Sequence, residues 1–111
     1  MIIHKELAEG RWFKFSLCEQ LANVGTDIDR TIRWKAKGDM EQSKRAFERA
    51  LELLTLTIMD PKHRKRLKEL TRARELLIDH FVYDNQYKTT DESWHNYFMY
   101  FSYRAAAQAG K

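Results

Sequence analysis

Apolar residues recur along most of this chain with the 3.6-residue period of an α-helix. In the first such run they fall within about 80° of one another on a helical wheel; they are Leu17, Leu21, Val24, Ile28 and Ile32. Ser16 and Glu19, which precede and enter this run, have the spacing of a capping box. Gly38 suits a helix C-terminus. The pattern predicts a first helix over about residues 16–37.

A second run follows at once, because Asp39 suits the N-cap of a new helix. Its apolar stripe predicts a helix over about residues 40–59 and consists of Met40, Phe47, Leu51, Leu54 and Ile58. Asp60 and Pro61 mark the next boundary, since aspartate caps a helix and proline suits its first turn. The third helix is predicted over about 61–82, with Leu67, Leu70, Leu77, Ile78 and Phe81 facing inward.

The fourth helix is predicted over about 91–108, after a capping box formed by Thr89 and Glu92. Its inward face carries Trp94, Tyr97, Phe98, Phe101 and Ala105. A short helical turn is also expected at Lys5–Glu9. Two of the connections between the long helices are very short, so neighbouring helices are expected to be antiparallel. The sequence therefore predicts an all-α fold, an up-down antiparallel four-helix bundle in one domain spanning residues 1–111.

Composition supports this fold class and bears on the cellular location of the protein. Glycine occurs 4 times and proline once, too few for the turns of most all-β folds. The single cysteine, Cys18, has no partner for an internal disulfide, which favours a cytoplasmic location. No apolar stretch approaches the ~18 residues of a membrane helix, so no membrane contact is expected. The formal net charge of +4 allows an acidic partner.

Aromatic residues crowd the C-terminal part of the chain, where the fourth helix is apolar on more than one side. Tyr100 and Tyr103 point away from the inward face, and Met99 lies on the outer side with them. A helix covered on both faces in so small a chain indicates a second subunit. We therefore expect self-association, most simply a dimer, through Tyr97, Tyr100 and Tyr103; the alternative is that these are ordinary surface tyrosines.

A basic run occupies the start of the third predicted helix, where the helix dipole disfavours cations. Four of these cations share one helical face, namely Arg64, Lys65, Lys68 and Arg72. That face is expected to bind an acidic protein or a nucleic acid such as RNA. The alternative is a solvated face partly paired with Glu69 and Glu75. No aromatic residue interleaves the stripe, so its spacing gives no support to stacking on single strands.

Two further positions have structural interpretations. Arg74 falls inside the apolar stripe of the third helix, which predicts a buried ion pair; the candidate carboxylates are Glu48, Glu52 and Asp27. Cys18 lies beside the first helix's stripe near Ala22 and Gly25, which indicates a close helix approach and a buried thiol. The histidines lack paired metal-ligand spacing, so neither a metal nor another cofactor is predicted.

The segment Arg74-Glu75-Leu76-Leu77-Ile78-Asp79-His80 resembles the HEPN class of helical domains. The motif of that class is an arginine followed after four to six residues by a histidine, which Arg74 and His80 satisfy. The resemblance implies a dimeric helical bundle and ribonuclease activity in a defence or toxin system. In such an enzyme Arg74 would stabilise the phosphate or the transition state, and His80 would act as general acid or base.

Three functional hypotheses follow from these patterns. The leading one is a small helical bundle that acts through self-association and protein–protein contacts. A HEPN-like ribonuclease and a non-catalytic nucleic-acid-binding module are the alternatives, so the sequence leaves open whether the protein is an enzyme.

Overall fold

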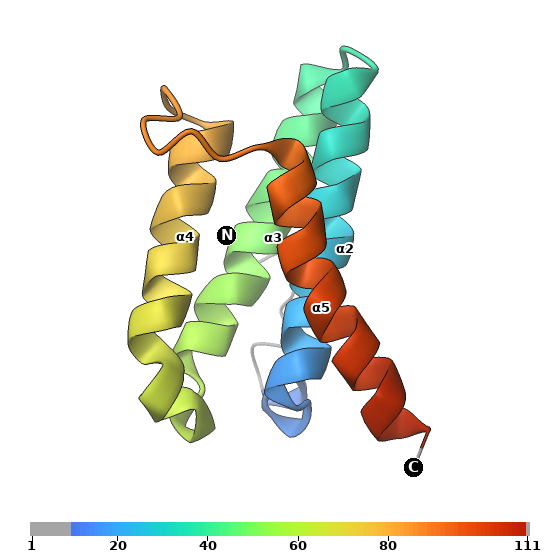
Figure 1. Cartoon of the computed structure of the whole chain (residues 1–111), viewed down its shortest axis with the longest axis vertical. Coiled ribbons are helices and arrows are strands. Elements are labelled where there is room, and N and C mark those ends of the chain that lie inside the picture. Colours follow the sequence, from blue (N-terminus) through green and yellow to red (C-terminus); the bar gives the residue numbers. More distant parts are fainter. Residues whose placement is uncertain (1–9, 111) are drawn as a thin grey trace.

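The computed structural model describes residues 10–110. All regular secondary structure in that range is helical (Figure 1). In chain order the elements are η1 (Arg11–Lys14), α2 (Leu17–Ala36), α3 (Met40–Met59), η2 (Pro61–Arg66), α4 (Leu67–Phe81) and α5 (Asp91–Ala109). The predicted all-α fold is therefore confirmed. The turn expected at Lys5–Glu9 lies outside the described residues.

The four long helices follow the predicted up-down order. The chain runs up α2, down α3, up α4 and down α5 in the view of Figure 1. The most extensive interface joins α2 to α3, the next joins α2 to α5, and α4 packs on α3 over a smaller area. Their shared core is built mainly from aliphatic and aromatic side chains; its fully buried members include Trp12, Leu21, Ile28, Leu54, Leu70 and Leu77. Among the described helices, none has an apolar stretch long enough to cross a bilayer.

The predicted starts of the first two long helices are confirmed atom by atom. The backbone N–H of Glu19 donates to Ser16 Oγ at 3.2 Å, and the backbone N–H of Ser16 donates to Glu19 Oε1 at 2.9 Å. Asp39 Oδ1 accepts from the backbone N–H of Gln42 at 3.1 Å and so caps α3. Gly38, between the two helices, has φ +78°, a conformation that favours glycine.

The third helix begins later than its sequence pattern predicts. Residues 61–66 form the 3-10 helix η2, and the α-helix starts only at Leu67. The break falls at His63, whose φ of −101° and ψ of 19° are not helical. His63 is buried, and its Nε2 lies 2.7 Å from Oε1 of Gln20 on α2. This long-range hydrogen bond accompanies the turn of the backbone away from a regular α-helix.

The capping box of the last helix is shifted by one residue from the predicted pair Thr89 and Glu92. The backbone N–H of Ser93 donates to Thr90 Oγ1 at 3.0 Å, and the backbone N–H of Thr90 donates to Ser93 Oγ at 3.1 Å. The Thr89 hydroxyl is instead engaged by Trp94 Nε1 at 3.1 Å. The hydroxyl that local spacing favours as the cap is thus occupied by a hydrogen bond from Trp94.

The small residues near Cys18 mark a close helix approach, as predicted. Gly25 is buried where α2 meets α5, and a Cβ built on it would lie 2.5 Å from Cβ of Phe98. Real Cβ atoms do not come that close, so only glycine allows the two helices their present separation. Cys18 is half-buried and packs against the core.

We expect Gly25→Ala to lower the free energy of unfolding by about 1–3 kcal/mol, because the added methyl group would force α2 and α5 apart. At an uncrowded site in a helix the same substitution stabilises by up to about 1 kcal/mol. Gly110→Ala is the matched control, since its Cβ would meet nothing closer than 3.5 Å. Urea unfolding measures both, and a Gly25→Ala variant at least as stable as the wild type would contradict the close approach.

Candidate functional site

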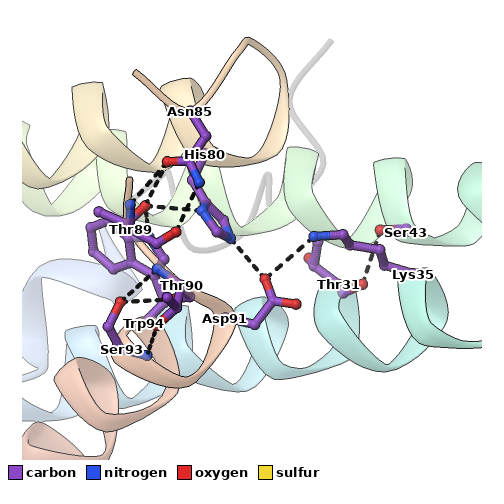
Figure 2. Close-up of polar contacts among 10 residues, drawn as sticks. All are labelled: Thr31, Lys35, Ser43, His80, Asn85, Thr89, Thr90, Asp91, Ser93 and Trp94. Carbon is purple, nitrogen blue, oxygen red and sulfur yellow. Dashed lines mark hydrogen bonds and ion pairs between the residues drawn. The ribbon is translucent and has the colours of Figure 1, made fainter. Parts of the chain in front are cut away.

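A cluster of polar side chains joins three helices at the end of the bundle where α5 begins (Figure 2). We call it the His80 junction; it consists of His80, Asp91, Thr89, Asn85 and Lys35. His80 Nε2 lies 2.7 Å from Asp91 Oδ1, and Lys35 Nζ on α2 lies 3.4 Å from the same oxygen. The ends of α2 and α4 therefore meet the first residue of α5 at one carboxylate.

The other side of the His80 ring is held by the loop that precedes α5. Thr89 Oγ1 lies 2.9 Å from His80 Nδ1, and Trp94 Nε1 donates to the same hydroxyl. Asn85 closes the loop, since its Oδ1 accepts from the backbone N–H of Thr89 at 3.0 Å and its Nδ2 donates to Thr89 O at 2.8 Å. Because the Asp91 carboxylate only accepts, Nε2 of His80 is the donor in their contact. The Thr89 hydroxyl lies within reach of both His80 Nδ1 and Asn85 Oδ1.

The carboxyl group of Asp91 is kept ionised by its neighbours. Burial alone would raise the pKa of Asp91, but the hydrogen bond from His80 and the charge of Lys35 outweigh it, so the pKa lies below its ordinary value. A charged Asp91 is thus the centre to which His80 and Lys35 are attached. The junction is built to hold helices together.

The structure does not join the pair that the HEPN resemblance implies. Only 6% of the His80 side-chain surface is exposed, and both ring nitrogens have protein partners. Arg74 is half-buried, and its Nε donates to Thr55 Oγ1 on α3 at 3.4 Å. Within residues 10–110, no hydrogen bond or ion pair is recorded between Arg74 and His80. A general acid or base needs a nitrogen within reach of substrate, so this geometry lends the ribonuclease prediction no support.

A second polar cluster, more deeply buried, lies around Gln20 at the other end of the bundle. Gln20 Nε2 donates to Trp12 O at 2.9 Å and to Asp60 Oδ2 at 3.0 Å, while its Oε1 lies 2.7 Å from His63 Nε2. Lys62 Nζ forms an ion pair with Asp60 and also donates to Phe13 O at 2.8 Å. We call these residues the Gln20 cluster; they fasten η1 and η2 to α2.

Burial and hydrogen bonds act on the pKa values of the two titratable groups at the centre of the Gln20 cluster. Burial lowers the pKa of His63, and the charges of Lys62 and Arg66 lower it further against the opposing effect of Asp60. For Asp60 burial acts to raise the pKa, but hydrogen bonds from Lys62 and Gln20 outweigh it and the pKa is lowered. A neutral His63 beside an ionised Asp60 is therefore the favoured state at neutral pH.

The four predicted cations form an exposed line along η2 and α4, which we call the basic surface: Arg64, Lys65, Lys68 and Arg72. The sequence pattern predicts that all four lie on one α-helical face. They do not, because Arg64 and Lys65 belong to the 3-10 helix η2. An open groove of about 860 Å³ is lined by Lys65, Lys68 and Arg72. Arg72 lies 3.6 Å from Glu75. The other cations, Arg64, Lys65 and Lys68, form no ion pair with another described residue and remain available to a partner.

An aromatic residue accompanies the basic surface, although none interleaves the stripe in the sequence. The ring of Tyr87, in the loop between α4 and α5, lies 4.7 Å from the guanidinium carbon of Arg72. Asp79 fixes this loop, since its carboxylate accepts from the backbone N–H groups of Gln86 at 3.1 Å and Tyr87 at 3.2 Å. Spacing within one helix could not reveal the contact, because Tyr87 lies in the loop after α4.

The three tyrosines predicted for self-association do not share one surface. Tyr97 packs inside α5's aromatic cluster, 5.0 Å from Phe98 between ring centres. Its hydroxyl is buried without a hydrogen-bond partner among the described residues, and burial, followed by the nearby charge of Glu69, raises the pKa of Tyr97 to about 12. Tyr100 and Tyr103 are 56% and 75% exposed. Only these two are placed to meet another molecule.

Searches of protein-family models, curated proteins and solved structures find no match to this chain. In the part of the chain that the structure describes, no three histidine, cysteine, aspartate or glutamate side chains gather to hold a metal ion.

Thr89→Val is expected to destabilise the fold by about 1–3 kcal/mol, because it leaves buried polar groups of His80 and Trp94 without the hydroxyl. Valine keeps the shape of threonine, so packing is nearly unchanged. Thr71→Val, at an exposed site on α4, is the control and should stay within about 0.5 kcal/mol of the wild type. Thermal and urea unfolding compare the three proteins; equal stability of all three would contradict the role of the junction.

The lowered pKa of His63 makes stability depend on pH. Below the ordinary pKa of 6.5, the unfolded chain binds a proton that the folded chain resists, so stability present above pH 6.5 is lost as pH falls. We expect the free energy of unfolding to fall less between pH 7.5 and pH 5.5 in His63→Asn than in the wild type. Urea titrations at a series of pH values measure this difference, and parallel pH profiles would contradict it.

Proposed function

We propose that this chain is a self-associating interaction protein whose two-fold contact is formed by the outer side of α5. This outer α5 face comprises Asn96, Met99, Tyr100, Tyr103 and Ala106. The observation that carries the proposal is the exposure of two tyrosines on a helix whose inner side is already filled, at 56% for Tyr100 and 75% for Tyr103. Tyrosine combines an apolar body with a polar tip and is enriched in protein interfaces.

The spacing along the outer α5 face suits a second helix. Its positions 96, 99, 103 and 106 are separated alternately by three and four residues, the repeat by which paired helices interlock their side chains. The C-terminal end of α5 leans away from the other helices in Figure 1, so the face is accessible. Alanines at 105, 106, 107 and 109 would let a partner helix approach closely.

The charge of this region favours a second copy as the partner. Arg104 is the only charged residue between Asn96 and Gly110, although 32% of the whole chain is charged. Two copies carry the same net charge and repel one another wherever like charges meet. A nearly uncharged face avoids that repulsion, and a two-fold contact requires a face that complements itself.

Tyr103→Glu is expected to weaken dimerisation at least about tenfold, because the contact would then bury two carboxylates. The wild type should have roughly twice the 13.3 kDa mass of one chain, and the variant should approach the mass of one. Light scattering and sedimentation equilibrium measure both. Tyr83→Glu is the control, since Tyr83 is 71% exposed in the α4–α5 loop, off the outer α5 face.

A wild type that remains monomeric at high concentration would contradict the proposal. A dimer that Tyr103→Glu leaves intact, or that Tyr83→Glu disrupts to the same extent, would contradict the assignment of the interface to α5. Far-ultraviolet circular dichroism confirms that each variant is folded before its mass is interpreted.

A further inference from the structure

The basic surface carries more positive charge than its surroundings neutralise. The two carboxylates of its groove are each paired with an arginine: Glu69 with Arg66 at 3.0 Å, and Glu75 with Arg72 at 3.6 Å. Lys65 and Lys68, in the same groove, have no recorded partner among the described residues. Arg64 extends this line of cations into η2. A ligand with regularly spaced negative charges would compensate them.

Tyr87 adds a second kind of binding group next to these cations. One side of its ring meets the guanidinium of Arg72, yet 57% of the residue remains exposed. Its backbone is fixed by the Asp79 carboxylate, which accepts from the N–H groups of residues 86 and 87. The backbone that carries the ring is therefore held in place before any ligand arrives, which reduces the entropy that binding would cost.

From this juxtaposition we propose that the basic surface and Tyr87 bind single-stranded nucleic acid. Phosphates lie along Lys65 and Lys68, and a base stacks on the exposed part of the Tyr87 ring. Single-strand-binding proteins combine a positive groove with aromatic rings in this way. An acidic protein would use the cations but has no general need for the ring. In a duplex the flat sides of the bases are already stacked on one another.

The proposed site does not depend on the self-association described above. None of its residues belongs to the outer α5 face, so the loss of one activity leaves the other testable. Lysines contact phosphates as point charges, and every base has a flat side that can stack. Binding should therefore tolerate many sequences and weaken steeply as salt is raised.

The first test measures fluorescence anisotropy of a labelled single-stranded uridine oligonucleotide over a series of salt concentrations. The double variant Lys65→Gln/Lys68→Gln should reduce the slope of log K against log salt by about 1.4, since each phosphate contact on a single strand contributes about 0.7. Lys37→Gln/Lys44→Gln removes the same charge from exposed lysines elsewhere and should keep the wild-type slope. Absence of binding at low salt, or equal slopes in the two double variants, would overturn the proposal.

The second test separates stacking from simple charge attraction. Tyr87→Ala should weaken single-strand binding between about fivefold and 150-fold, the range measured for loss of one stacked base, whereas Tyr87→Phe should keep it. Duplex RNA of the same length and polyglutamate are the competing ligands. If either binds as tightly as the single strand, or if Tyr87→Ala binds like the wild type, the site is not one for single strands. Unfolding curves for both Tyr87 variants show that any loss is local.

Discussion

The close approach of α2 and α5 at Gly25 is the constraint on which the rest of this structure depends. With no side chain at Gly25, Phe98 comes against the backbone of α2, and α5 can lay its aromatic residues on the core. Filling the inner side of α5 in this way leaves the other side of the same helix free. The exposure of Tyr103, the most exposed tyrosine among the described residues, thus goes with the tight packing of Phe98 on the opposite side of α5.

Polar contacts at the two ends of the bundle attach segments that apolar packing alone does not hold. The backbone of α4 makes fewer close approaches to α3 than α2 does, and the two ends of α4 are fastened by side chains. The Gln20 cluster holds η2, which leads into α4, and the His80 junction holds the other end to α5. Each uses a histidine beside an aspartate, and each loses water contacts that its hydrogen bonds must replace. These two attachments also fix the ends of the basic surface and of the loop that carries Tyr87.

Much of this fold could be predicted from sequence, because its signals are local. Periodic apolar residues and the caps at Ser16 and Asp39 lie within a few positions of the elements they determine. The errors arise where a specific side-chain contact overrides the local pattern. His63 breaks its helix beside Gln20, 43 residues away, and Thr89 gives up the cap because His80 and Trp94 engage its hydroxyl. For the two proposed surfaces, sequence spacing pointed to the four cations and to the outward position of Tyr100 and Tyr103, all of which are exposed. It could not place Tyr87 on Arg72, since that contact depends on how separate segments meet. Tyr97 lies inward, as the apolar stripe of the fourth helix predicts, and therefore not on the outer α5 face.

The Thr89 hydroxyl gives the α4–α5 loop a rotatable hydrogen bond. It lies 2.9 Å from His80 Nδ1 and 3.3 Å from Asn85 Oδ1, so its hydrogen has two acceptors within reach. The Gln20 cluster has no such rotor at its histidine, because Nε2 of His63 faces an amide oxygen and burial opposes an added charge on the ring. Acid therefore loosens the helix bundle where η2 meets α2.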